Sequence, residues 1–414
     1  MNGAPADLLI RNLRPWDGTS AVDLAVRYGR FVEATPDLEA SQTIDAGGRL
    51  AVAGFIDPHI HLDKVMINRD VRTNVSGTLT EAIEIIWEKK RRYTVEDIVA
   101  RAGSVIESAV ANGITRLRTH VDVDTIGGLT PLEGVLAARE KYRRCIDIQI
   151  VAFPQEGILR DPGTDELMTK AMEMGADVVG GMPFNEASPA DSARHIRLAF
   201  ELARAFDADI DMHVDETDDP NARTLEMLAD QTIENGYEGR VTAGHTCALA
   251  AYPDDYAARV IAKVRRARLH MITNPATNLM LQGRLDAEPK RRGITRVGEL
   301  MAAGINVSYG QDCVRDTFYP FGRDDPLEVA LLTAHAAHLS QPPQIEQLFA
   351  MPTTNAARVL RLTDYGLTPG CAADIAILDA GDAAEAIRLQ APRRWVIKAG
   401  RVVAETELRR RTWI

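Results

Sequence analysis

The chain has 414 residues, 45% of them hydrophobic and 26% charged, a composition typical of a globular enzyme with enough apolar material for a large core. Its formal net charge of −11 and its short, separated basic runs argue against a nucleic-acid partner. No apolar run reaches the length of a membrane span, and the N-terminus lacks a signal-peptide pattern, so we expect a cytoplasmic protein. The four cysteines are far apart and form no Cys-x-x-Cys pair, which argues against a disulfide framework or a structural zinc site.

Short strand patterns occupy both ends of the chain. They cover residues 8–13, 21–26, 29–34, 373–378 and 394–403. Each cluster is too small to bury a core by itself. We therefore expect residues 1–53 and 361–414 to pair as one small β-sandwich.

Between these ends, strand and helix patterns alternate over residues 54–360. The apolar segment 49–53 is expected to form the first strand of this region, and Pro58 is expected to end it. Seven more strands are expected at 115–121, 147–153, 177–182, 209–214, 241–245, 269–273 and 306–310. Amphipathic helix patterns lie between strands at 95–112, 131–142, 164–174 and 191–206. This alternation predicts an α/β fold, a (β/α)₈ barrel of the TIM type.

His59 and His61 follow the expected first strand and are separated by one residue. Strand side chains alternate between faces, so two histidines with this spacing project from the same face and can bind one metal ion together. A His-x-His pair also occurs as two packing residues. The pair alone does not decide between these interpretations.

More polar residues stand where other barrel strands are expected to end, which is the edge at which barrel enzymes carry their chemistry. They are Gln155 after strand three, His213 and Glu216 at strand five, His245 at strand six and Asp312 after strand eight. Four histidines and a carboxylate converging on one face favour a metal site over packing. His120 is a weaker candidate for the pocket. The other histidines are assigned structural roles because they fall in helix patterns or at a strand start: His195, His270, His335 and His338.

Several longer segments carry a resemblance to a known family. They are residues 54–63, 118–123, 149–157, 290–297 and 364–366. Together they resemble the amidohydrolase superfamily and, within it, the bacterial cytosine deaminases. Segments 61–64 and 234–242 are instead similar to the N-isopropylammelide aminohydrolases, which act on a triazine ring.

The resemblance implies one divalent metal ion, bound by His59, His61, His213 and Asp312. Neutral imidazoles with one carboxylate suit Zn²⁺ or Fe²⁺, and such an ion lowers the pKa of a bound water to about 7. Binuclear members of the superfamily carry a bridging lysine on strand four. Segment 178–184 contains no lysine, so a single metal is expected.

The implied reaction is deamination of an amino-substituted nitrogen heterocycle such as cytosine, with release of ammonia. Glu216 is expected to move a proton to the ring nitrogen, Asp312 to protonate the departing amine and His245 to hydrogen-bond the attacking water. Three alternatives remain open: release of an alkylamine, opening of a cyclic amide, and an inactive barrel that serves as an assembly partner. Retention of every ligand argues against the inactive barrel.

The pocket departs from the cytosine deaminase pattern at two positions. That family has a second aspartate where Cys313 stands and a tryptophan where Phe318 stands. Because a thiol is a poor hydrogen-bond acceptor, we expect a roomier pocket for a ring with a larger or differently placed substituent. The alternative is that Cys313 only packs and cytosine remains the substrate.

Two further residues complete the expected substrate contacts, Gln155 at the amide edge of the ring and Lys64 beside the metal-binding histidines. The expected partner is thus a small heterocyclic substrate, with no nucleic acid and no membrane. A homo-oligomer is also expected.

Overall fold

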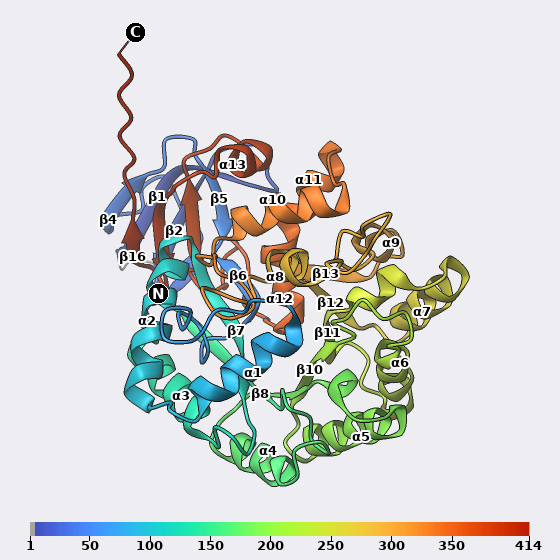
Figure 1. The fold of residues 1–414 in the computed structure, drawn as a ribbon. Helices are drawn as coiled ribbons and strands as arrows, with labels where there is room; N and C mark the ends of the chain where they lie inside the picture. The colour runs from blue at the N-terminus through green and yellow to red at the C-terminus, as the bar shows by residue number, and fades with distance from the viewer. Residues whose placement is uncertain (1–4, 414) are drawn as a thin grey trace.

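The computed structural model describes residues 5–413 and consists of an eight-stranded parallel barrel beside a second, mostly antiparallel sheet (Figure 1). Neighbouring barrel strands follow one another in chain order from β6 to β13. They are β6 (Phe55–Ile60), β7 (Ile114–Asp122), β8 (Asp147–Phe153), β9 (Val178–Gly181), β10 (Asp209–Val214), β11 (Val241–His245), β12 (His270–Thr273) and β13 (Asn306–Tyr309). The expected (β/α)₈ barrel of the TIM type is confirmed.

Helices surround the barrel on its outside (Figure 1). The four expected ones are α2 (Val95–Ala111), α3 (Thr130–Tyr142), α4 (Thr164–Glu173) and α5 (Pro189–Ala205), each within two residues of its expected ends. The start of α5 shows capping chemistry: the Ser188 side chain accepts from Asp191 N, and Pro189 takes the first helical position. The remaining barrel helices are α1 (Leu79–Lys90), α6 (Thr224–Asn235), α7 (Asp254–Arg266), α8 (Pro275–Leu281), α9 (Val297–Ala302), α10 (Pro326–Ala337), α11 (Pro342–Ala350) and α12 (Ala356–Val359).

Both ends of the chain form the second sheet, where blue and red strands lie together in Figure 1. Its strands are β1 (Ala6–Pro15), β2 (Val22–Arg27), β3 (Arg30–Val32), β4 (Ala40–Asp45), β5 (Leu50–Ala53), β14 (Ile375–Leu378), β15 (Arg393–Lys398) and β16 (Arg401–Glu405). Leu8, Ile10 and Phe31 from the N-terminal strands pack in one core cluster with Ile375 and Ile377. The expected β-sandwich of both termini is therefore confirmed, although strand β4 and helix α13 (Ala383–Leu389) were not expected.

The start of the barrel differs from the sequence-based expectation. Segment Leu50–Ala53 does not lead the barrel, because β5 pairs with β14 and β1 in the terminal sheet. The first barrel strand is β6, which contains Pro58 instead of ending before it. Proline is tolerated there because the pairing of β6 with β7 is irregular between Asp57 and Ile60, and no ladder donor is needed at such an irregularity.

Gly54 makes the transition from one sheet to the other possible. A Cβ atom at this position would lie 2.3 Å from Oγ1 of Thr115 on β7. Only glycine therefore fits where the chain between β5 and β6 approaches β7.

The barrel closes between β6 and β13 through the residues that follow or end these strands. Asp312 N donates to His59 O at 2.8 Å, and His61 N donates to Asp312 O at 3.1 Å. Gly310 lets the two strands approach, because a Cβ atom there would lie 2.6 Å from His59 Cβ. Barrel closure thus brings three sequence-predicted ligands together.

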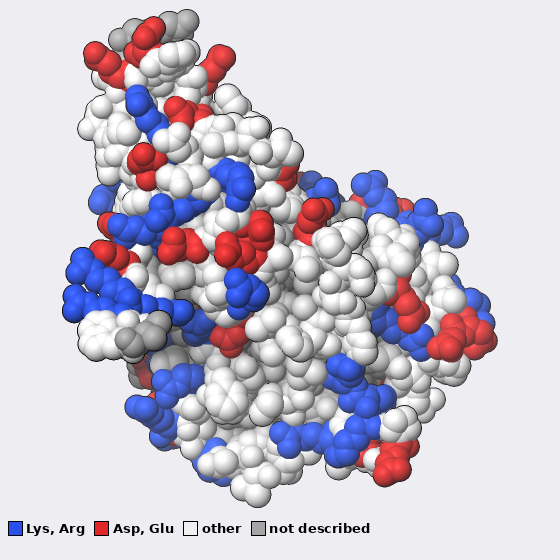
Figure 2. All heavy atoms as spheres, turned by 90° about the horizontal axis from the view of Figure 1, so that it is seen from above, with Lys and Arg blue, Asp and Glu red and all other residues white. Residues whose placement is uncertain are grey.

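The surface shows no single dominant charge on the face drawn in Figure 2, where groups of Lys and Arg alternate with groups of Asp and Glu around a mostly uncharged middle. Among residues 5–413, no helix is both long and apolar enough to cross a membrane. All four cysteines lie within this range and are free.

Candidate metal centre and active site

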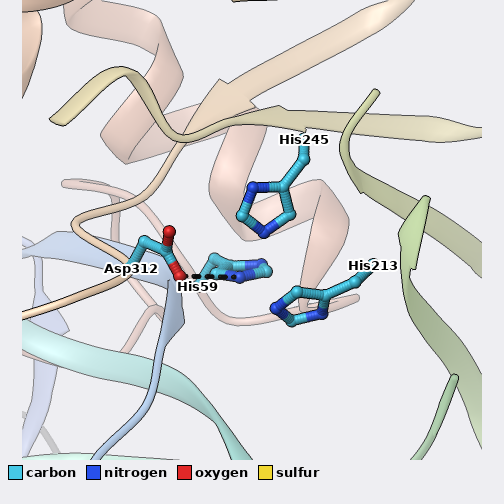
Figure 3. A group of neighbouring side chains, drawn as sticks. All are labelled: His59, His213, His245 and Asp312. Carbon is cyan, nitrogen blue, oxygen red and sulfur yellow. Dashed lines mark ion pairs between the residues drawn. The ribbon is translucent and has the colours of Figure 1, made fainter. Parts of the chain in front are cut away.

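Four buried side chains at the carboxyl ends of the barrel strands point toward one another: His59, His213, His245 and Asp312 (Figure 3). One ligand atom of each lies within 4.8 Å of the others. His59 Nε2 is 3.4 Å from Asp312 Oδ1. His61 is not in this mutual group, but its Nε2 is 3.3 Å from Asp312 Oδ1 and 3.0 Å from His213 Nε2.

The backbone adopts left-handed conformations at several of these strand ends. The φ angles are +65° at His245, +66° at Asp312 and +47° at Asp215, which lies between two site residues. Such conformations are costly for residues other than glycine and concentrate at functional sites. Three of them around one group of polar side chains mark this end of the barrel as functional.

Burial favours the neutral form of three histidines, His59, His61 and His213. Burial, followed by the nearby His120, lowers the pKa of His59 well below its usual value. Burial likewise lowers the pKa of His61 to about 4 and that of His213 well below 6.5. Burial opposes ionisation of Asp312, yet His245, followed by the nearby His59 and His61, lowers its pKa overall. The group therefore offers imidazole lone pairs and one ionised carboxylate.

These residues fit a divalent metal ion. Within residues 5–413, both ring nitrogens of His59 and Nδ1 of His213 are buried without a hydrogen-bond partner, an unfavourable arrangement unless something binds them. His61 Nδ1 lies 3.2 Å from His120 O, and donation to this carbonyl leaves the Nε2 lone pair free to bind the ion. Three imidazoles and a carboxylate suit zinc or iron.

Glu216 and His245 lie against each other beside this group. Glu216 Oε1 is 3.2 Å from His245 Nδ1 and accepts from Asn278 Nδ2 at 3.2 Å. The second ring nitrogen of His245 is 3.1 Å from Asn274 Nδ2. Burial opposes protonation of His245, but Glu216 and Asp312 raise its pKa overall. A carboxylate and an imidazole in such contact can exchange a proton with a bound ligand.

The chain holds Glu216 in place through its neighbour Asp215. The Asp215 carboxylate accepts from Thr224 N at 3.0 Å, Thr224 Oγ1 at 2.6 Å and Leu225 N at 2.9 Å, at the start of α6. These bonds fix the turn between β10 and α6 that carries Glu216.

A small inner cavity brings together all the residues expected to contact the substrate. Phe318 and Cys313 form its apolar side, packed in one cluster with Tyr319 and Ala276. The full lining is His61, Lys64, Leu79, Ile83, Phe153, Gln155, Met182, His213, Glu216, Thr277, Asp312, Cys313 and Phe318. Leu79, Ile83, Met182 and Glu216 also line an outer cavity of about 680 Å³, which leads from the surface to the inner one.

The remaining histidines lie outside this lining. His120 is fully buried behind His59, with ring centroids 4.2 Å apart, and its Nε2 is 3.3 Å from Asp211 Oδ1. His195 donates from Nδ1 to Glu186 Oε1 at 2.7 Å and accepts from Met182 N. The other three bond locally or end a helix: His270 near Asn306, His335 to Leu331 O, and His338 at the end of α10.

One feature beside the site was not expected from the sequence, a buried network of charges. Lys90 Nζ lies 2.8 Å from Asp122, 2.6 Å from Asp124 and 3.2 Å from Glu156. Lys64 Nζ lies 2.6 Å from the other oxygen of Asp122. The available signal was that these carboxylates stand directly at the ends of β7 and β8, where functional residues gather.

The fold and the site define a metal-binding barrel hydrolase, and the comparisons give its family. A model of the amidohydrolase family matches residues 42–404. The chain is 31% identical over 413 residues to the N-isopropylammelide isopropyl amidohydrolase of Pseudomonas sp. strain ADP, which covers 97% of this chain and 98% of the relative. The chain therefore belongs to the amidohydrolase family, and it hydrolyses C–N bonds other than peptide bonds.

Two further similar proteins are deaminases of nitrogen-containing rings. The pterin deaminase of Rhizobium rhizogenes is 32% identical over 394 residues, 94% of this chain and 89% of the relative. The crystal structure of 5-methylcytosine deaminase from Klebsiella pneumoniae, liganded with 5-fluorocytosine, matches with a TM-score of 0.93 and 38% identity over 98% of this chain and 99% of that chain. The expected resemblance to cytosine deaminases is confirmed.

Proposed function

We propose that the chain deaminates an amino-substituted pyrimidine, with 5-methylcytosine as the first candidate, and releases ammonia. The observation that carries this proposal is the inner cavity, which places Glu216, Gln155 and Cys313 against the histidine and aspartate group. The match with the Klebsiella enzyme over nearly the whole length supports the same reaction class.

His59, His61, His213 and Asp312 would hold one metal ion. His245 is left out of the ligand set because both of its ring nitrogens already contact Asn274, Asn278 or Glu216. A bound zinc or iron ion would supply a water whose pKa is lowered to about 7. One ion is proposed because β9 and the residues after it contain no bridging lysine.

The protein side chains divide the proton transfers. Glu216 accepts a proton from the attacking water and delivers it to the ring nitrogen, while His245 hydrogen-bonds that water. Asp312, which is ionised, takes the second proton from the hydroxyl group added to the ring and passes it to the amine, which leaves as ammonia. Gln155 binds the amide edge of the ring, opposite the apolar side formed by Phe318.

Cys313 sets the size of the pocket on the side away from the amide edge. Its thiol is smaller and less polar than the aspartate of cytosine deaminases, and it packs with apolar residues. A methyl group on the pyrimidine ring fits this environment better than a polar one. This is the reason to place 5-methylcytosine before cytosine.

Release of an alkylamine is the second candidate function. It is favoured by segment 61–64, which is shared with the N-isopropylammelide hydrolases, and by the end-to-end match with the Pseudomonas enzyme. The departing group distinguishes the two candidates.

The test is a substrate panel for metal-replete enzyme, consisting of 5-methylcytosine, cytosine, pterin and N-isopropylammelide, with ammonia and alkylamine measured separately. We expect ammonia and a 2,4-dioxo pyrimidine from 5-methylcytosine, with a smaller kcat/KM on cytosine. Alkylamine release without deamination of any pyrimidine would instead establish the second candidate. The identity of the metal, the cytoplasmic location and the homo-oligomeric state stay predictions.

A further inference from the structure

Lys64 follows β6 and is completely buried, with both of its polar contacts inside the protein. Its Nζ donates to Asp122 Oδ1 at 2.6 Å and also to Gln155 Oε1. The second oxygen of Asp122 is bound by Lys90 Nζ at 2.8 Å. The Asp122 carboxylate thus fixes the position of the Lys64 ammonium, and Lys90 in turn fixes the position of Asp122.

The surrounding charges keep Lys64 protonated. Burial alone would lower its pKa, but Asp122 and Asp63 raise the pKa above the usual value. A lysine ammonium has three N–H donors and no acceptor. Any group that bonds to Lys64 Nζ must therefore present an acceptor to it.

This requirement fixes the orientation of the Gln155 side-chain amide. Its oxygen must face Lys64, because the reverse orientation would place the amide N–H groups against an ammonium. Loss of a hydrogen bond to a charged group disfavours the reverse orientation by about 10- to 150-fold. The main chain is held as well, since Asn185 Nδ2 donates to Gln155 O at 2.8 Å.

The NH₂ group of the Gln155 amide remains available to a ligand. Gln155 Nε2 is buried and has no hydrogen-bond partner in the part of the chain that the structure describes. The side chain lines the inner cavity next to Lys64. The site therefore offers a donor from Nε2 and the second lone pair of Oε1, in a fixed order.

We propose that Lys64 is a positioning residue. It holds the Gln155 amide in the orientation in which Oε1 accepts from a ring N–H and Nε2 donates to the neighbouring carbonyl. A ring with donor and acceptor exchanged does not pair with this orientation. This inference rests on the proposed function and refines its substrate class to 2-oxo rings with an unsubstituted neighbouring nitrogen. Lys64 therefore acts through Gln155 instead of contacting the substrate, which revises the role expected from the sequence.

Two matched rings test this orientation. 5-Methylcytosine presents N1–H and the 2-oxo group, whereas 2,4-diamino-5-methylpyrimidine presents a bare N1 and a 2-amino group, the exchanged pattern of donor and acceptor. We expect wild-type enzyme to prefer the first ring by about 10²-fold or more in kcat/KM, since unpaired polar groups give strong rejection. In Lys64→Met the amide can rotate, and the preference should fall to about 10-fold or less, mainly through KM.

A double variant separates positioning from direct contact. In a Gln155→Ala background, Lys64→Met should change neither KM nor the preference further, because the residue through which it acts is gone. Lys398→Met is the matched control for loss of a buried lysine: it removes a partner of Asp147 and Asp374 but none of Asp122 or Gln155. It should lower the melting temperature and leave the preference unchanged.

Gln155→Glu tests the same orientation with Lys64 in place, should Lys64→Met fail to fold. Lys64 would hold one carboxylate oxygen, and the other would accept from a 2-amino group, so the preference should move toward the diamino ring. An unchanged wild-type preference in Lys64→Met or Gln155→Glu would overturn the inference, as would a Lys64→Met effect that persists without Gln155. Failure of wild-type enzyme to bind or deaminate either ring would instead overturn the proposed function, and the inference with it.

Discussion

Glu216 is held beside the metal-binding group without being part of it. Its carboxylate contacts His245 and Asn278, and its chain position is fixed through Asp215. Glu216→Gln preserves the shape of the side chain and removes its proton transfer, so kcat should fall by about 10²-fold or more while metal content stays unchanged. Kinetics with elemental analysis on the same sample checks this.

Glu173→Gln is the matched control, because Glu173 is exposed at the end of α4, outside both cavities. It should behave as wild type. A Glu216→Gln enzyme with full metal and a near-normal kcat would show that another group carries the proton.

Under the proposed function, Cys313 determines the preference for 5-methylcytosine over cytosine. Its thiol lies near the buried carboxylate of Asp316, whose pKa burial raises to about 7. Cys313→Asp would restore a polar acceptor and reduce the room for a methyl group. The ratio of kcat/KM for cytosine to that for 5-methylcytosine should therefore rise by about 10-fold or more, the scale of discrimination against one methyl group.

Cys313→Ser keeps a small donor at this position and should leave that ratio near the wild-type value. If Cys313→Asp and Cys313→Ser give the same ratio, Cys313 only packs and does not set the specificity.

Element types were predictable where the sequence pattern is long and local. The helix patterns of α2 to α5 repeat over many residues, and α2 and α5 also start at side-chain caps, so they gave nearly correct boundaries. The transition from β5 to β6 was not predictable in this way, because the two short strands are separated only by Gly54 and only their partner strands distinguish them. The strand end expected at Pro58 was wrong for the same reason, because a proline is tolerated within β6 only where the pairing with β7 is irregular.

The seam between β6 and β13 offers a test at the level of these strands. In Gly310→Ala the new Cβ would lie 2.6 Å from both His59 Cβ and His59 O, so the strands must separate. We expect a loss of about 1–3 kcal/mol in the free energy of unfolding, the usual cost of overpacking, together with weaker metal binding because His59 moves.

Gly298→Ala provides the control on α9, because no atom lies within 4 Å of the added Cβ. It should stabilise the protein by about 0.5–1 kcal/mol through the higher helix propensity of alanine. Denaturant unfolding of both variants checks the pair, and equal stability of the two would contradict the account of the seam.

In the molecule as a whole, the site assembles from strand ends that are far apart in sequence. The metal-binding candidates were predictable because histidines at strand ends, each uninformative by itself, converge as a set. The buried network was not, because Asp122, Asp124 and Glu156 at the ends of β7 and β8 indicate a polar region but not their partner, Lys90, which lies on a helix. Only the folded barrel shows that they share one interior, and that Lys64 belongs to it.

Titration of metal-free enzyme with Zn²⁺ or Fe²⁺, with ammonia release from 5-methylcytosine as the readout, tests the central claim most directly. The account predicts that activity rises in proportion to added metal and levels off at one ion per chain. It also predicts one ammonia for each ring converted. Activity that keeps rising until a second tightly bound ion is present would contradict the account, as would a fully loaded enzyme that releases no ammonia from any amino-pyrimidine.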